Sequence, residues 1–255
     1  MSTRPPIPPG IVGHHRAHVT AHYAVLPPAG IMDSLLPGLS GCILRFMTSP
    51  RMGARFAQAL LLVAPGGGTD KPLADGLEHF LYVLSGRLTV SLADRQEVLG
   101  PGAFVYVPQT AAFAFRNPDA AEARALWIKR PYQALPGIAP PPARFGHRDA
   151  APREDVDGRW RYWLLGTGDL SMDFEMNIMG FGPGTHFHCV ETHIMEHGLY
   201  MLRGQGLQLL GRDWHEIWEG DFVWMGPYVP QQFYATGWGP AEYLLYKDVN
   251  RDVTF

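Results

Sequence analysis

Residues 79–86 read HFLYVLSG and residues 197–204 read HGLYMLRG, so one short pattern occurs twice, 118 positions apart. Chance gives two or three matches at one offset, but here the agreement continues without gaps through the flanking segments. The chain therefore contains two copies of one domain. The further matched residues are Pro65-Gly66 with Pro183-Gly184, Gly102 with Gly220, Phe104-Val105 with Phe222-Val223, and Lys129 with Lys247.

The repeated residues are turn glycines and strand aromatics, which are the parts that a β-barrel needs. The chain has 29 Gly and 23 Pro among 255 residues. Short apolar runs, such as residues 80–84, 104–107 and 222–225, are bounded by Gly or Pro. This pattern predicts an all-β protein with two tandem small β-barrels of the jelly-roll type, the double-stranded β-helix.

Composition also indicates how the two copies are arranged along the chain. Residues 1–40 precede the first copy and are expected to pack across a barrel as an N-terminal arm. Residues 41–132 form the first barrel and residues 158–255 the second. Residues 133–157 are rich in Pro and Ala, which predicts an extended, semi-rigid linker without strand or helix.

Bulk properties exclude several classes of function. Hydrophobic residues make up 46% of the chain and charged residues 18%, as in a compact globular protein. The net charge is −3 and no basic block occurs, which argues against a nucleic-acid partner. No apolar run is long enough for a signal core or a membrane span, so a cytoplasmic protein is expected. Cys42 and Cys189 lack metal-type spacing and are expected to be buried free thiols.

Polar residues of the second copy have a spacing that suits a metal site. They read Gly184-x6-Glu191-x-His193-x3-His197-x6-Gly204, and Gln231 lies eleven residues after Gly220. Residues two apart on a strand face the same side, so Glu191 and His193 can both point into the barrel. The pattern resembles the two motifs of the cupins, which carry a divalent metal in a small β-barrel. The resemblance implies that Glu191, His193, His197 and Gln231 bind a metal.

The first copy lacks this set. At the same offset its residues are Leu73, Asp75, His79 and Phe113. An apolar side chain replaces one ligand, and a phenylalanine stands where the second copy has Gln231. We therefore expect a metal in the second barrel only.

Two further histidines offer an alternative ligand pair. His186 and His188 have the H-x-H spacing of the commoner cupin motif, with Glu196 as the third ligand. That motif then requires a glycine at position 203, where Arg203 stands. A loop position beside the site is the favoured reading for both histidines, and His215 is expected on the surface or in a turn.

The donor set restricts the metal. Two imidazoles, one carboxylate and one amide without a thiolate form a fairly hard site, which suits Mn(II) or Fe(II) better than structural zinc. The ligand types alone favour Mn(II) only weakly, because intrinsic affinity favours zinc or copper.

Longer segments resemble one family of two-barrel cupins, the (S)-ureidoglycine aminohydrolases. The segments are ETHIMEHGLYMLRGQG, YKDVNRDVTF, YAVLPPAG, LPG, GCILR and HFLYVLSG. The resemblance implies a bicupin hydrolase that uses Mn(II) to release ammonia from (S)-ureidoglycine, giving (S)-ureidoglycolate in purine and allantoin catabolism. It also implies that Glu191, Gln231, Tyr243 and Lys247 contact the substrate, and that Glu191 and Lys247 act in catalysis. The chain departs from its relatives at Gln208, where they carry a tyrosine, and this puts one substrate contact in doubt.

Two other classes of function stay open at this point. An Fe(II) bicupin dioxygenase usually presents three histidines, which Gln231 fits poorly. A non-catalytic small-molecule-binding cupin predicts disrupted ligand positions in both copies. Exposed strand edges and the arm also favour a homo-oligomer.

Overall fold

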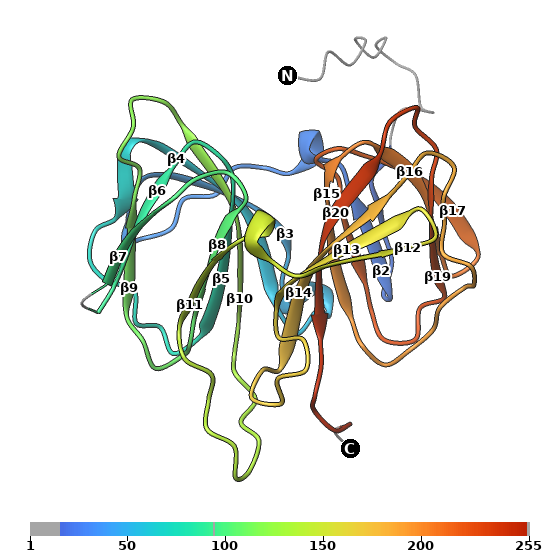
Figure 1. Ribbon diagram of the computed structural model, residues 1–255. Coiled ribbons are helices and arrows are strands. Elements are labelled where there is room, and N and C mark those ends of the chain that lie inside the picture. Colours follow the sequence, from blue (N-terminus) through green and yellow to red (C-terminus); the bar gives the residue numbers. More distant parts are fainter. Residues whose placement is uncertain (1–15, 94, 254–255) are drawn as a thin grey trace.

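The computed structural model describes residues 16–93 and 95–253, and within them it shows two β-barrels side by side (Figure 1). Residues 1–15 of the predicted arm, residue 94 and residues 254–255 lie outside the described residues. The first barrel contains β3 (Leu39–Thr48), β4 (Ala57–Thr69), β5 (Glu78–Ser85), β6 (Leu88–Leu92), β7 (Arg95–Leu99), β8 (Ala103–Val107), β9 (Phe113–Arg116), β10 (Ala123–Arg130) and β11 (Arg144–His147).

The second barrel repeats this order of strands. It contains β12 (Arg153–Val156), β13 (Arg159–Leu165), β14 (Phe174–Phe181), β15 (His197–Arg203), β16 (Gln205–Leu210), β17 (Asp213–Trp218), β18 (Phe222–Met225), β19 (Gln231–Ala235) and β20 (Ala241–Asp248), together with β1 (His18–Val19) and β2 (Tyr23–Leu26). Short 3-10 turns are η2 (Pro28–Gly30), η3 (Pro50–Met52) and η4 (Arg148–Ala150). The prediction of an all-β, two-barrel protein is confirmed.

The pairing register of the strands repeats at the offset found in the sequence. Ala125 of β10 pairs with Leu61 of β4, and Tyr243 of β20 pairs with Met179 of β14, 118 residues later in each strand. Because side chains alternate between the two faces of a strand, equal register places equivalent residues on the same face of each barrel. The two copies can therefore be compared residue by residue.

Each barrel is completed by a strand that precedes the other copy in the sequence. The N-terminal β2 pairs with β18 of the second barrel, where Figure 1 shows it in blue among the orange and red strands. In turn, β11 lies just before the second copy and pairs with β8 of the first barrel. This exchange ties the two barrels together through backbone hydrogen bonds.

The linker prediction is wrong in one respect, because residues 133–157 contain β11 and β12. The prolines of this segment, at 136, 140–142 and 152, leave residues 144–147 with free backbone N–H donors. Those donors complete the edge of β8, which would otherwise present unpaired polar groups. A short proline-free segment was enough to form a strand.

Apolar side chains form a core inside each barrel and a third core between them. Residues such as Leu61, Val83 and Trp127 fill the interior of the first barrel. The core between the barrels is aromatic, and the rings of Phe56 and Tyr246 stack with centroids 3.9 Å apart. Gly198 lies against the Phe56 ring across this interface, where a Cβ would meet the ring at 2.6 Å.

A buried ionic cluster crosses the same interface. Arg130 of the first barrel lies 3.2 Å from the Asp173 carboxylate and 3.4 Å from that of Glu78, and it donates a 2.6 Å hydrogen bond to the Tyr246 hydroxyl. The Tyr106 hydroxyl donates to Glu78 at 2.9 Å. Two carboxylates share one guanidinium in an apolar environment, so burial and the nearby Asp173 raise the pKa of Glu78 to about 9.

The two cysteines differ from the sequence-based expectation. Both are free, as predicted, but only Cys42 is buried, whereas Cys189 is exposed in the loop that precedes Glu191. Among residues 16–93 and 95–253 there is no helix with the length and hydropathy to cross a membrane.

Candidate metal and substrate site

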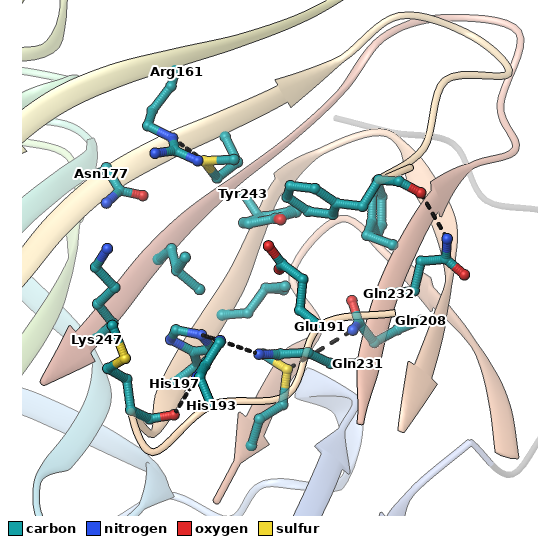
Figure 2. Close-up of a pocket in the computed structure, with 17 residues that line it drawn as sticks. Arg161, Asn177, Glu191, His193, His197, Gln208, Gln231, Gln232, Tyr243 and Lys247 are labelled. Carbon is teal, nitrogen blue, oxygen red and sulfur yellow. Dashed lines mark hydrogen bonds between the residues drawn. The ribbon is translucent and has the colours of Figure 1, made fainter. Parts of the chain in front are cut away.

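A cavity of about 280 Å³ opens inside the second barrel, and Figure 2 shows the side chains that line it. It contains all the sequence-predicted site residues. The lining residues are Arg161, Asn177, Met179, Phe187, Glu191, His193, Met195, His197, Leu199, Gln208, Met225, Gln231, Gln232, Phe233, Tyr243, Leu245 and Lys247. A cavity of this size suits a small polar metabolite rather than a cofactor as large as a nucleotide.

The two predicted histidine ligands face each other. Their Nε2 atoms are 3.2 Å apart. The Nδ1 atom of His193 lies 3.2 Å from the carbonyl oxygen of Met195, and that of His197 lies 3.3 Å from the carbonyl oxygen of Tyr246. A carbonyl oxygen can only accept, so each Nδ1 carries a proton, and the Nε2 atoms are left to face each other. Two Nε2 atoms at this distance are placed to bind one cation together.

The third predicted ligand, Gln231, completes a cluster of three donors. Its side-chain nitrogen is 2.8 Å from Nε2 of His193. The oxygen and nitrogen of a glutamine amide are interchangeable by a flip, so the same position offers an oxygen ligand. Gln231 begins β19 and is almost fully buried, which holds its amide in place.

Glu191, from the first of the two motifs, reaches the cavity next to Gln231, with which it forms a β-bridge. Its backbone N–H and C=O exchange two 2.9 Å hydrogen bonds with those of Gln231. Figure 2 shows its carboxylate directed toward Tyr243, away from the two imidazoles. Burial first, and then the negative charge of Glu191, raise the pKa of the Tyr243 hydroxyl, so this group stays protonated and able to donate.

The donors present fit a divalent cation. Two nitrogen ligands about 2.0–2.1 Å from one metal ion lie about 2.8–3.4 Å apart for angles between 90° and tetrahedral. The separations of 3.2 Å and 2.8 Å around His193 agree with this range. Among the described residues, no three His, Cys, Asp or Glu side chains already converge as a metal cluster, because Glu191 is turned aside.

The protonation of His197 matches the state that a ligand requires. Burial, then the neighbouring His193 and Lys247, lower the pKa of His197 to about 3. The ring is therefore neutral at ordinary pH, and a metal ion meets a free lone pair without displacing a proton. Carbonyl groups that hold the far nitrogen of a ligating histidine are the usual support for such a ring.

Lys247 lines the cavity next to Glu175 and supplies a positive charge there. Its Nζ lies 2.6 Å from the Glu175 carboxylate, and the two residues face each other across β20 and β14. Both side chains are largely buried. In the first barrel the equivalent lysine, Lys129, lies opposite Ala57 and has no such carboxylate on that strand. Position in the repeat alone therefore does not determine what this lysine does.

Besides Gln208, which the sequence singled out only as a departure from the relatives, the cavity has polar residues that were not predicted, among them Arg161 and Asn177. Arg161 lies on β13, its guanidinium 4.5 Å from the centre of the Trp163 ring, and Asn177 and Gln208 are buried amides. A comparison of the two copies of the repeat could have identified these residues. At the 118-residue offset the first copy has Ile43, Ala59 and Val90, so all three polar side chains occur only in the barrel that has the cavity.

The alternative histidines lie away from the cavity. His186 and His188 are both exposed, and the ring of His186 stacks on Tyr234 with centroids 5.2 Å apart. His215 lies half-buried on β17, next to His18 and Tyr23. Neither His186 nor His188 is among the residues that line the cavity.

The first barrel shows the same backbone motif with its space filled. Leu73 and Phe113 form a bridge equivalent to that of Glu191 and Gln231. The Phe113 ring packs 4.8 Å from the ring of His79. Trp127 donates to Nδ1 of His79, so its Nε2 carries the proton and donates to Asp75 at 3.0 Å. His79 thus has protein partners on both nitrogens and no lone pair left for a metal.

Comparisons with known proteins place the chain among the cupins. A family model for the cupin domain matches residues 59–129, in the first barrel. The (S)-ureidoglycine aminohydrolase of Escherichia coli (strain K12) is 33% identical over 91% of this chain and 90% of that protein. The probable (S)-ureidoglycine aminohydrolase of Oryza sativa subsp. japonica is 30% identical over 98% of this chain and 82% of that protein. A solved structure, a putative glyoxylate-induced protein from Pseudomonas aeruginosa, is 33% identical with a TM-score of 0.87 and covers 94% of this chain and 93% of its own.

Proposed function

Because this chain belongs to the (S)-ureidoglycine aminohydrolase family of bicupin hydrolases, we propose that it hydrolyses (S)-ureidoglycine to (S)-ureidoglycolate and ammonia. One water is consumed and one carbon–nitrogen bond is broken. The observation that carries the proposal is the pair of facing imidazoles, His193 and His197, in a cavity of metabolite size. This reaction belongs to purine catabolism.

The proposed cofactor is Mn(II), held by Glu191, His193, His197 and Gln231. Imidazole, carboxylate and amide donors without a thiolate suit a hard or borderline cation. When bound, such an ion acts as a Lewis acid that orients and polarises the reacting groups of the substrate.

The chain's own residues have distinct proposed roles. Lys247, held by Glu175, binds the substrate carboxylate as a positive point charge. Glu191 accepts or passes on a proton near the leaving amine, since its carboxylate lines the cavity and forms no ion pair with any of the described residues. The raised pKa of Tyr243 keeps its hydroxyl as a hydrogen-bond donor next to Glu191. Gln231 contacts the substrate through the side of its amide that faces the cavity.

A direct assay tests the proposal. Freshly generated (S)-ureidoglycine is given to the metal-free protein with and without added Mn(II), and ammonia release above the spontaneous rate is measured. We expect release that depends on Mn(II) and reaches saturation with substrate. Oxygen uptake by iron-loaded protein, without ammonia release, would instead indicate a dioxygenase. Binding without turnover in either assay would leave a small-molecule-binding cupin.

Assembly and location stay predictions of the sequence. A homo-oligomer is expected from exposed strand edges, and β12 is such an edge, with all four residues exposed. The cytoplasm is the expected compartment.

A further inference from the structure

Asn177 is a buried amide with an unused hydrogen-bonding group at the cavity. It lies in the middle of β14, is 1% exposed and lines the cavity wall. Its side-chain oxygen makes no hydrogen bond with any of the described residues. A buried polar group without a partner destabilises a fold, so its presence here needs a reason.

The other barrel shows that this reason is not structural. The equivalent residue of the first barrel is Ala59, which is buried in the apolar core on the same face of the same strand. An alanine therefore satisfies the fold at this position. Asn117, a buried amide with a structural role, differs sharply: its nitrogen donates to Val63 and Ala121, and its oxygen accepts from Asp119.

The surroundings of Asn177 indicate which group of a ligand it meets. In Figure 2 it lies along one wall between Lys247 and Arg161. The strand register supports this placement. Asn177 pairs with Leu245, which lies two residues before Lys247, and with Trp163, which lies two residues after Arg161. The cations suit a carboxylate. A neutral amide, with an acceptor and two donors, matches a neutral group that offers both N–H and C=O.

Resting on the proposed function, we propose that Asn177 is a specificity-determining residue that hydrogen-bonds the ureido group of the substrate. Its oxygen accepts from the terminal NH2, which satisfies the buried acceptor only when a ureido ligand is present. An analogue in which a methyl group replaces this NH2 leaves the acceptor unpaired, and a site built around such a bond rejects the analogue strongly.

Two ligands isolate this contact. N-carbamoylglycine carries a carboxylate and a ureido group, whereas N-acetylglycine has a methyl group in place of the terminal NH2. Calorimetric titration of the metal-loaded protein with each ligand gives the preference as a ratio of dissociation constants. We expect the protein to bind N-carbamoylglycine about tenfold or more tightly, the ratio that follows from one unpaired buried acceptor.

Two variants and a matched control attribute the preference to Asn177. Asn177→Leu and Asn177→Ala are expected to bring the ratio close to one, chiefly by weakening N-carbamoylglycine binding, and to leave the unfolding temperature unchanged or raised. Asn117→Ala removes a buried amide of the first barrel. It is expected to lower the unfolding temperature and to keep the full preference.

The possible outcomes separate this assignment from the proposed reaction. Equal affinity of the natural protein for the two ligands would overturn the role of Asn177, and so would a preference that survives both substitutions. An equal loss of both ligands would assign Asn177 to the carboxylate and also overturn the proposal. Ureido-selective binding without ammonia release from (S)-ureidoglycine would sink the proposed reaction while Asn177 keeps its role.

Discussion

The Nε2 atoms of His193 and His197 face each other across 3.2 Å, while each ring has its Nδ1 against a backbone carbonyl oxygen. The carbonyls determine the tautomer of both rings, and the tautomer determines where the lone pairs point. A cation between the rings removes the repulsion of these lone pairs. The facing arrangement of the two rings, rather than either histidine alone, therefore indicates a metal site.

The first prediction concerns metal content. His193→Ala removes one of the two facing lone pairs, so we expect metal affinity to fall by a factor of about 10–100 or more, since even changes beyond the ligands have effects of that size. Elemental analysis after dialysis measures the metal bound per chain. His186→Ala is the matched control, because His186 is exposed and does not line the cavity. Full occupancy in His193→Ala would exclude this site.

The second prediction compares equivalent lysines of the two barrels. Lys247→Met removes the charge proposed to bind the substrate carboxylate, so we expect kcat/KM to fall by about 100-fold or more, the scale of a charged hydrogen bond in a dry site. Metal content should not change. Lys129→Met, 118 residues earlier, should leave both unchanged because the first barrel has no such site. Near-normal turnover of Lys247→Met would remove this lysine from the mechanism.

The third prediction concerns the residue at one repeat position, which is Gln231 in the second barrel and Phe113 in the first. Gln231→Phe places in the second barrel the residue that fills the first, and we expect a folded protein that has lost metal binding and activity. The reverse change, Phe113→Gln, removes a buried ring that packs on His79 and Trp127. It should lower the free energy of unfolding by about 3–5 kcal/mol. Chemical denaturation of both variants measures these effects, and a stable Phe113→Gln would contradict the packing argument.

The fourth prediction concerns pH and the cluster between the barrels. Because the pKa of Glu78 rises from about 4.5 to about 9 on folding, the native protein holds a proton that the unfolded chain has released between these values. The free energy of unfolding therefore falls as pH rises through this window. Glu78→Gln cannot lose that proton, so we expect its free energy of unfolding to fall less between pH 5 and 9 than that of the natural protein.

Denaturant midpoints at several pH values measure this difference. Glu154→Gln is the control, since Glu154 is exposed on the edge strand β12 and should show the same pH dependence as the natural protein. A parallel pH dependence in Glu78→Gln would show that Glu78 is ionised in the folded state.

Much of the fold was predictable because it depends on local pattern. The turn glycines and alternating strands that repeat at 118 residues predicted two equal barrels, and the strand register repeats at that offset. The exchange of β2 and β11 was not predictable, because strand pairing between distant segments leaves no spacing in the sequence. The same limit explains why the sequence of residues 133–157 predicts a linker and does not reveal its two strands.

Part of the site was also predictable. The spacing of Glu191, His193 and His197 placed them on one wall, and the repeat identified Gln231 as the residue that differs from Phe113. The direction of the Glu191 carboxylate was not predictable, because a side-chain torsion depends on its neighbours. Neither was the ion pair of Lys247 with Glu175, two residues that are 72 positions apart along the chain.

By itself, then, the order of residues determined that two copies of one β domain exist and that only the later copy has the donors for a metal. It could do so because glycine turns, strand alternation and ligand spacing act over a few residues. The tertiary structure alone decided that the two Nε2 atoms face each other, that Lys247 has a carboxylate beside it, and that the Asn177 oxygen has no hydrogen-bond partner among the described residues. These depend on contacts between strands that are distant in sequence, where burial removes the water that would otherwise satisfy each group.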